Sequence, residues 1–93
     1  MEGKGRFIAI NSKKVFYAEY GSKGKAMLLL HGWSGSHENF NRWLPVFKGK
    51  YRVIIPDLPG CGMSEPLDKR HTLEAYAEFL EEFVEKLGLN KFI

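Results

Sequence analysis

Two glycine-rich stretches contain the residues that are best suited to chemistry. Residues 31–36 read HGWSGS and residues 57–66 read DLPGCGMSEP, and each stretch follows an apolar run. Since glycine has no side chain, backbone N–H groups in such loops can approach a ligand closely. N–H groups held in this way stabilise a negative charge that develops on an oxygen atom. The two stretches therefore indicate a site that could hold an oxyanion, although glycine-rich loops follow strands in many α/β folds.

The histidines, the cysteine and one loop aspartate are the other candidates for chemistry. His31, His37 and His71 lack the spacing of metal ligands, so we expect no metal site. We expect His31 to be a structural histidine at a strand end, and the other two to lie on the surface. Cys61 is the single cysteine, which excludes an intramolecular disulfide, and we expect an ordinary loop thiol. Asp57 stands where aspartate usually accepts hydrogen bonds from the loop backbone.

Other binding motifs and compositional signals are weak. Residues 60–65 read GCGMSE, which lacks the third glycine of a dinucleotide-binding loop and does not open a helix. The sequence contains no Walker A loop either, so we expect no cofactor. The chain has 14 Lys and Arg against 11 Asp and Glu, for a net charge of +3, and its basic residues form no continuous run. This scatter argues against nucleic-acid binding.

Signals for membrane insertion and secretion are also missing from the sequence. The longest apolar run, residues 26–30, is far shorter than the ~20 residues that a membrane-spanning helix needs. The opening residues, MEGKGRF, lack the apolar core of a signal peptide. The hydrophobic fraction of 44% is typical of a globular protein and too high for a disordered one. We therefore expect a cytoplasmic protein with no membrane contact.

The glycine-rich stretches must be positioned by the strands that precede them. Residues 7–10 and 15–20 are typical of two strands, and the short polar link between them predicts an antiparallel hairpin. Residues 26–30 are continuously apolar, as expected of a strand that is buried on both faces of a sheet. Residues 51–56 predict a further buried strand, and residues 90–93 have the pattern of the start of another.

Two helices are expected between and after these strands. The first covers about residues 37–47 with Ser36 as its N-cap, and Pro45 predicts that it is short or broken. The second covers residues 73–87 and is capped by Thr72. Helical spacing puts apolar residues on one face of each helix: Phe40, Trp43, Leu44 and Phe47 in the first, and Leu73, Tyr76, Phe79, Leu80, Phe83, Val84 and Leu87 in the second. From the third strand onward strands and helices alternate, which predicts an α/β fold with helices on the faces of a parallel sheet.

The two stretches together resemble the α/β-hydrolase family. Residues 31–35 match its H-G-x-x-G loop and residues 57–64 match its D-x-x-G-x-G-x-S loop, in the order and strand-then-loop context of that family. The resemblance covers nearly the whole chain and looks most like the branch with esterases, epoxide hydrolases, dehalogenases and proline iminopeptidases. It implies one partial domain, residues 1–93, that forms the N-terminal third of an α/β-hydrolase. The implied fold is an incomplete three-layer unit, an antiparallel hairpin followed by parallel β-α-β-α.

The resemblance also implies roles for the residues after the third strand. In the family, the residue after His-Gly donates its backbone N–H to the oxyanion hole, and here that residue is Trp33. The expected substrate-binding residues are then His31, Gly32, Trp33 and Ser34, and the substrate of the complete enzyme would be a small acyl compound. The second loop, at residues 57–64, would mainly brace the site.

The nucleophile, acid and base of the family have no counterpart in these 93 residues. The nucleophile elbow G-x-S-x-G should follow the strand that starts at Lys91. The stretch around Ser34 has its second glycine at the wrong position, and the stretch around Ser64 ends in Pro66 where glycine is required. In the dehalogenase and epoxide-hydrolase branches the nucleophile is an aspartate, so both types stay open. We expect the chain alone to be inactive.

A partial sheet of this kind has a physical problem. The family's strand order, 1-2-4-3-5, leaves the strand at residues 26–30 without a neighbour on one side, and an open edge tends to pair with other chains. A small α/β unit also buries little surface. We therefore expect the chain to be marginally stable, to self-associate or to be completed by a second polypeptide. The alternative to an enzyme fragment is a non-catalytic subunit or interaction module that binds through this edge, and a degenerate product is a third hypothesis.

Overall fold

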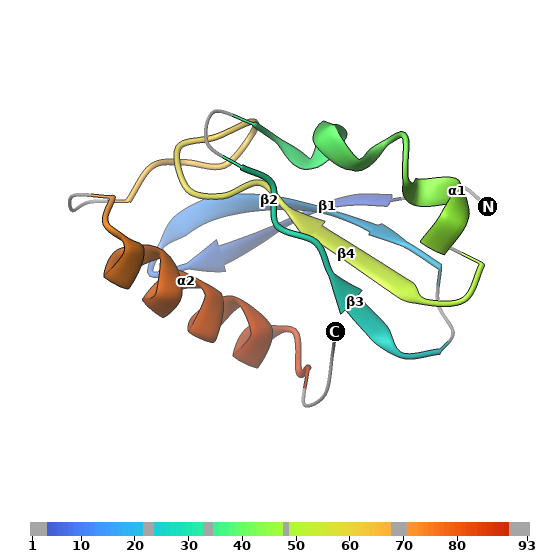
Figure 1. Cartoon of the computed structure of the whole chain (residues 1–93). Helices are drawn as coiled ribbons and strands as arrows, with labels where there is room; N and C mark the ends of the chain where they lie inside the picture. Colours follow the sequence, from blue (N-terminus) through green and yellow to red (C-terminus); the bar gives the residue numbers. More distant parts are fainter. Residues whose placement is uncertain (1–3, 22–23, 33–34, 48, 68–70, 90–93) are drawn as a thin grey trace.

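The structure, a computed structural model, describes residues 4–21, 24–32, 35–47, 49–67 and 71–89. Its elements in chain order are β1 (Lys4–Ile10), β2 (Lys13–Tyr20), β3 (Ala26–Leu28), the 3-10 helix η1 (His37–Phe40), α1 (Leu44–Phe47), β4 (Arg52–Pro56) and α2 (Leu73–Lys86). The four strands form one sheet in the order β1-β2-β4-β3, with α2 on one face and η1 and α1 on the other (Figure 1). This confirms the expected three-layer α/β architecture.

The N-terminal hairpin forms as the sequence predicts, although β1 begins earlier than expected. Residues of β1 pair antiparallel with β2 from Lys4 opposite Glu19 to Ile10 opposite Lys13. The two linking residues, Asn11 and Ser12, have φ values of 51° and 66°. Positive φ at both positions of a two-residue link gives the type I′ turn, whose twist matches that of the strands on either side.

The central strand β4 links the hairpin to the rest of the sheet. It runs antiparallel to β2, with Tyr17 opposite Pro56, and parallel to β3, with Met27 opposite Val53. The side chains of Val53, Ile54 and Ile55 are 0% exposed, as expected for a strand covered on both faces.

The edge strand β3 is shorter and more open than the sequence suggests. Its ladder ends at Leu28, although the Leu29 N–H still donates to the Ile54 carbonyl over 3.0 Å. Leu30 is 42% exposed, so the prediction of a strand buried throughout residues 26–30 is wrong at its end. The reason is the position of β3 at the edge of the sheet, where no described strand lies beyond it. The strand start expected at residues 90–93 lies outside the described residues.

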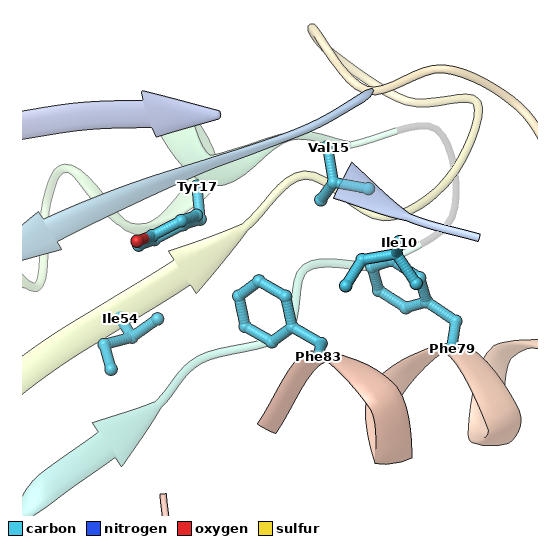
Figure 2. Close-up of a cluster of buried hydrophobic side chains, with 6 residues drawn as sticks. All are labelled: Ile10, Val15, Tyr17, Ile54, Phe79 and Phe83. Atoms are coloured by element: carbon cyan, nitrogen blue, oxygen red, sulfur yellow. The ribbon is translucent and has the colours of Figure 1, made fainter. Parts of the chain in front are cut away.

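Helix α2 covers one face of the sheet, and the larger cluster of the core lies between this helix and the strands. Figure 2 shows its aromatic side chains pointing toward β1, β2 and β4. The members of this cluster are Ile10, Val15, Tyr17, Ile54, Phe79 and Phe83. Thr72 caps the helix as expected, because its Oγ1 accepts the Ala75 N–H over 3.0 Å. The prediction that Leu73 belongs to the core is wrong: it is 85% exposed, since it lies about 200° around the helix from the buried Ala75.

The opposite face is covered by two short helices in place of one, which confirms the predicted break near Pro45. Ser36 caps η1, with its Oγ accepting the Glu38 N–H over 3.2 Å. Leu44 packs against Val53 and Ile55 of β4. The prediction of one continuous apolar face fails at Trp43, which is 53% exposed, because the break between η1 and α1 changes the direction of the following side chains. Among the described residues, no helix has the length and apolar character needed to cross a membrane.

Candidate functional site

The two glycine-rich loops follow the carboxyl ends of β3 and β4, and direct hydrogen bonds join them. The Leu58 N–H donates to His31 Nε2 over 2.9 Å. The His37 N–H donates to Asp57 Oδ1 over 2.6 Å. His31 and His37 flank residues 32–36, so two consecutive residues of the second loop hold both ends of the first loop. Adjacent parallel strands put their carboxyl ends at the same end of the sheet. Ligands of open α/β sheets bind just outside these carboxyl ends.

His31 is buried and uses both ring nitrogens within the protein. It is 5% exposed, and its Nδ1 lies 2.8 Å from the Gly32 carbonyl oxygen. Since Nε2 accepts the Leu58 N–H, the proton belongs on Nδ1, which donates to that carbonyl. An imidazole bonded in this way has no free nitrogen for proton transfer, which confirms the structural role that the sequence predicts.

Asp57 lies at the centre of the contact between the loops. Its side chain is 0% exposed, Oδ1 accepts the His37 N–H, and Oδ2 accepts the Met63 N–H over 2.9 Å. These bonds confirm that Asp57 binds loop backbone. Gly62 is required beside it, because its φ is +52° and an added Cβ would meet the Asp57 carboxylate.

His37 is not the surface residue that the sequence suggests. Its side chain is 16% exposed, and its Nδ1 lies 2.8 Å from Asp57 Oδ1. Its ring also packs on that of Phe16, with 4.8 Å between centroids. Sequence reasoning missed this pair because the two residues are 20 positions apart and meet only when β3 and β4 lie side by side. The sequence offered one signal of this pair: Asp57 follows a buried strand and has no cationic residue close to it in the sequence, so its carboxylate needs a partner from elsewhere.

The loop at residues 57–66 is tied to the hairpin as well. Ser64 Oγ accepts the Phe16 N–H over 2.9 Å and donates to the Asp57 carbonyl over 2.7 Å. The Glu65 N–H donates to the Lys14 carbonyl over 2.8 Å. The Ser64 hydroxyl therefore both accepts and donates a hydrogen bond within the protein. This agrees with the expectation that Ser64 is not a nucleophile.

The second half of this loop contacts the start of α2. His71 Nε2 accepts the Leu67 N–H over 3.0 Å, and Nδ1 lies 3.2 Å from the Tyr76 hydroxyl. His71 is thus bonded at both nitrogens, and the expectation of an ordinary surface residue is wrong. Burial raises the pKa of Tyr76 above its usual value of 10.0, and the nearby Cys61 raises it further.

Only some of the site residues that the resemblance implies belong to the described part of the chain. Trp33 and Ser34 are outside the described residues, so their roles stay predictions. Gly32 is exposed, and an added Cβ there would meet nothing within 4 Å. Its carbonyl accepts a second hydrogen bond, from the Gly35 N–H over 3.0 Å.

Among the described residues, surface hollows also lie away from the first loop. One, of about 220 Å³, is lined by residues of the hairpin turn and α2, including Ile10, Ala75 and Phe79. Another, of about 330 Å³, follows β1 and is lined by Phe7 and Lys14 among others. Neither hollow includes His31 or Gly32, so the candidate site rests on the loops and not on these hollows. In the described part of the chain, no group of three or more His, Cys, Asp or Glu side chains could hold a metal ion.

Known proteins match both the sequence and the fold. A family model described as "alpha/beta hydrolase fold" matches residues 25–93. An uncharacterized hydrolase of Saccharomyces cerevisiae is 35% identical over 81 residues, which cover 85% of this chain and 28% of that protein. Lipase 1 of Psychrobacter immobilis is 40% identical over 78 residues, covering 82% of this chain and 24% of the lipase.

A solved structure of haloalkane dehalogenase DbeA from Bradyrhizobium elkani superimposes with a TM-score of 0.92 at 25% identity. The match covers 98% of this chain and 32% of the dehalogenase chain. The 93 residues thus span about a third or less of the relatives that they match. Because the matches include a lipase and a dehalogenase, they agree with the branch that the loops resemble.

Proposed function

Because the chain belongs to the α/β-hydrolase fold family, we propose that residues 31–36 form the oxyanion side of a hydrolase active site. In this proposal the backbone N–H of Trp33 donates to the oxyanion, Gly32 and Ser34 line the substrate beside it, and the buried His31 holds the start of the loop. The reaction is hydrolysis of an ester- or amide-type acyl substrate. The nucleophile, the acid and the base come from polypeptide other than these 93 residues.

The observation that carries the proposal is the attachment of this loop at both of its ends. His31 and His37 are bonded to Leu58 and Asp57, while Gly32 between them is exposed with open space around its Cα. Donors for an oxyanion must be fixed before the reaction, since their benefit comes from not having to reorganise. A loop that is held at both ends, with open space at Gly32, meets both requirements.

The peptide unit that begins at Gly32 supports the same assignment. Its carbonyl accepts hydrogen bonds from His31 Nδ1–H over 2.8 Å and from the Gly35 N–H over 3.0 Å. The loop's own donors therefore hold this carbonyl, and the donors of an oxyanion hole must be held in place before the reaction. One such donor is worth about 10²–10³ in kcat.

A hybrid enzyme tests this proposal. Residues 1–93 replace the matching N-terminal part of lipase 1 from Psychrobacter immobilis, which contributes the rest of the polypeptide. We expect the hybrid to hydrolyse p-nitrophenyl butyrate, and the 93-residue chain alone to show no turnover. A hybrid that melts cooperatively but hydrolyses nothing would overturn the proposal. Turnover by the chain alone, if abolished by a serine-directed inhibitor, would contradict the absence of a nucleophile.

A second candidate function follows from the open edge of β3, and we propose it as the alternative. In the described part of the chain, β3 pairs with β4 alone, and the apolar Leu30 next to it is exposed. A strand of a partner chain, or of a second copy, could pair with this edge and make the chain a non-catalytic interaction module. Light scattering after size-exclusion chromatography is the check. A monodisperse monomer with a sharp cooperative thermal transition would contradict this alternative.

A further inference from the structure

His37 stands at the point where the first loop ends and η1 begins, and it makes two bonds to one buried atom. Its backbone N–H and its ring Nδ1 lie 2.6 Å and 2.8 Å from Asp57 Oδ1. An ionised carboxylate can only accept hydrogen bonds, so Nδ1 must carry the proton in this contact. The backbone bond can form with any residue except proline at position 37, whereas the ring bond depends on the side chain.

We propose that His37 is a positioning residue for the oxyanion loop, acting through its Nδ1–H bond to Asp57. The bond fixes the exit of residues 32–36, as the bond from Leu58 to His31 fixes their entry. The inference depends on the proposed function for its catalytic consequence, while the positioning itself can be measured without any activity.

The surroundings of the imidazole explain why its position is defined. The Asp57 carboxylate lies on one side, and the Phe16 ring packs against the imidazole with centroids 4.8 Å apart. Phe16 is itself fixed, because its carbonyl accepts the Asp57 N–H over 2.9 Å and its N–H donates to Ser64 Oγ. The ring is therefore held between β2 and the end of β4, two elements that belong to the sheet.

Loss of the ring would also change the carboxylate. The Asp57 side chain is 0% exposed, and two of the three hydrogen bonds that its carboxylate accepts from described residues come from His37. A buried charge that loses a partner draws in water or another donor, or takes up a proton. We expect each of these outcomes to shift His37, which stands at the end of the loop.

Three substitutions at one position separate the ring bond from the size of the side chain. Asparagine carries its Nδ2 on Cγ, as histidine carries Nδ1, so H37N can restore the donor at the same place. H37Q places its donor one bond farther out, and H37L has none. H71L serves as the matched control, since His71 bonds to Leu67 and Tyr76 and to neither end of the first loop.

The first measurement uses the 93-residue chain itself and records the ¹H–¹⁵N signals of Gly32 and Gly35. We expect H37L and H37Q to shift both signals, H37N to return them to the wild-type positions, and H71L to leave them unchanged. Unmoved signals in H37L would overturn the inference. If H37L does not fold, the comparison of H37N with H37Q decides in the same way.

The second measurement uses the hybrid enzyme and separates kcat from KM. A misplacement of the donors should lower kcat by about 10- to 100-fold in H37L with little change in KM, and H37N should restore it. A kcat in H37L equal to the parent's would overturn the catalytic part of the inference. An equal loss of kcat in H37L and H37N, accompanied by a lower melting temperature, would also overturn it, because that pattern would indicate a purely structural role for His37. If the parent hybrid is itself inactive, the proposed function fails, and the signals of Gly32 and Gly35 still decide whether His37 positions the loop.

Discussion

The two glycine-rich loops are similar in composition and opposite in how they are held. In the loop at residues 57–66, the Asp57 side chain is 0% exposed, Ser64 is 7% exposed, and hydrogen bonds reach the hairpin from Ser64 and Glu65. The loop at residues 31–36 is bonded to the rest of the protein at its two ends, while Gly32 stays open. The loop at residues 57–66 is thus a structural support, and the proposed function makes the loop at residues 31–36 the element that meets a ligand.

The same contrast explains where substitutions should be tolerated. The supporting loop is packed at Asp57 and Ser64, so added atoms and lost hydrogen bonds there cost folding free energy. Gly32 in the other loop has open space beside it, so small changes there should affect catalysis more than stability. Matched substitutions in the two loops test this distinction.

Gly62→Ala should have the largest effect on stability. The φ of +52° disfavours alanine, and the new Cβ would meet the buried Asp57 carboxylate, which cannot move away. We expect a loss of about 3 kcal/mol in the free energy of unfolding, measured by urea denaturation. Gly32→Ala is the matched control, and its effect should stay within about 0.5 kcal/mol because nothing lies within 4 Å of the added Cβ. Equal losses in both variants would contradict the distinction between the loops.

Ser64→Ala should come next. It removes the acceptor of the buried Phe16 N–H and the donor to the Asp57 carbonyl, and leaving such groups unpaired costs about 1–3 kcal/mol. Ser36→Ala is its counterpart in the other loop. The Ser36 hydroxyl accepts the exposed Glu38 N–H at 3.2 Å, so we expect a loss below about 1 kcal/mol. Denaturation under the same conditions gives both values, and a larger loss in the Ser36 variant would reverse the order.

The smallest expected effect is on the free energy of unfolding at alkaline pH. Burial, and secondly the nearby Cys61, raise the pKa of Tyr76, so the folded chain holds this proton more tightly than the unfolded chain does. Stability should therefore be fully present below about pH 10 and decrease as the pH rises above it. Tyr76→Phe should weaken this decrease when the unfolding free energy is measured between about pH 9 and about pH 11. Burial also raises the pKa of Tyr17, followed by the effect of Glu19, so part of the decrease should persist. An unchanged slope in the Phe variant would argue against the raised pKa.

Much of this arrangement could be predicted from the sequence. The hairpin, the alternation of strands and helices, the helix interruption just before Pro45 and the caps at Ser36 and Thr72 follow from local patterns, and the structure confirms them. The same patterns place both loops after parallel strands.

The failures have a common physical cause, which is that they depend on contacts between distant residues. Leu73 and Trp43 have apolar side chains at helical spacing, but Leu73 lies away from the buried side of α2 and Trp43 lies in the break between η1 and α1, so both are exposed. The pairing of His37 with Asp57 requires β3 and β4 to be neighbours, which no local pattern reports. The support for the candidate site was therefore harder to predict than the candidate site itself.

The most direct test of the central claim removes one N–H group. In the hybrid enzyme, ligation at the Gly60–Cys61 junction allows the Trp33 amide to be replaced by an ester, which keeps the indole, removes the N–H and also weakens the Gly32 carbonyl as a hydrogen-bond acceptor. If this N–H holds the oxyanion, kcat should fall by about 10²–10³ with KM nearly unchanged. Trp33→Phe with its amide intact is the control and should keep most of kcat. A kcat in the ester variant equal to that of the parent would contradict the assignment of residues 31–36 to the oxyanion side of the site.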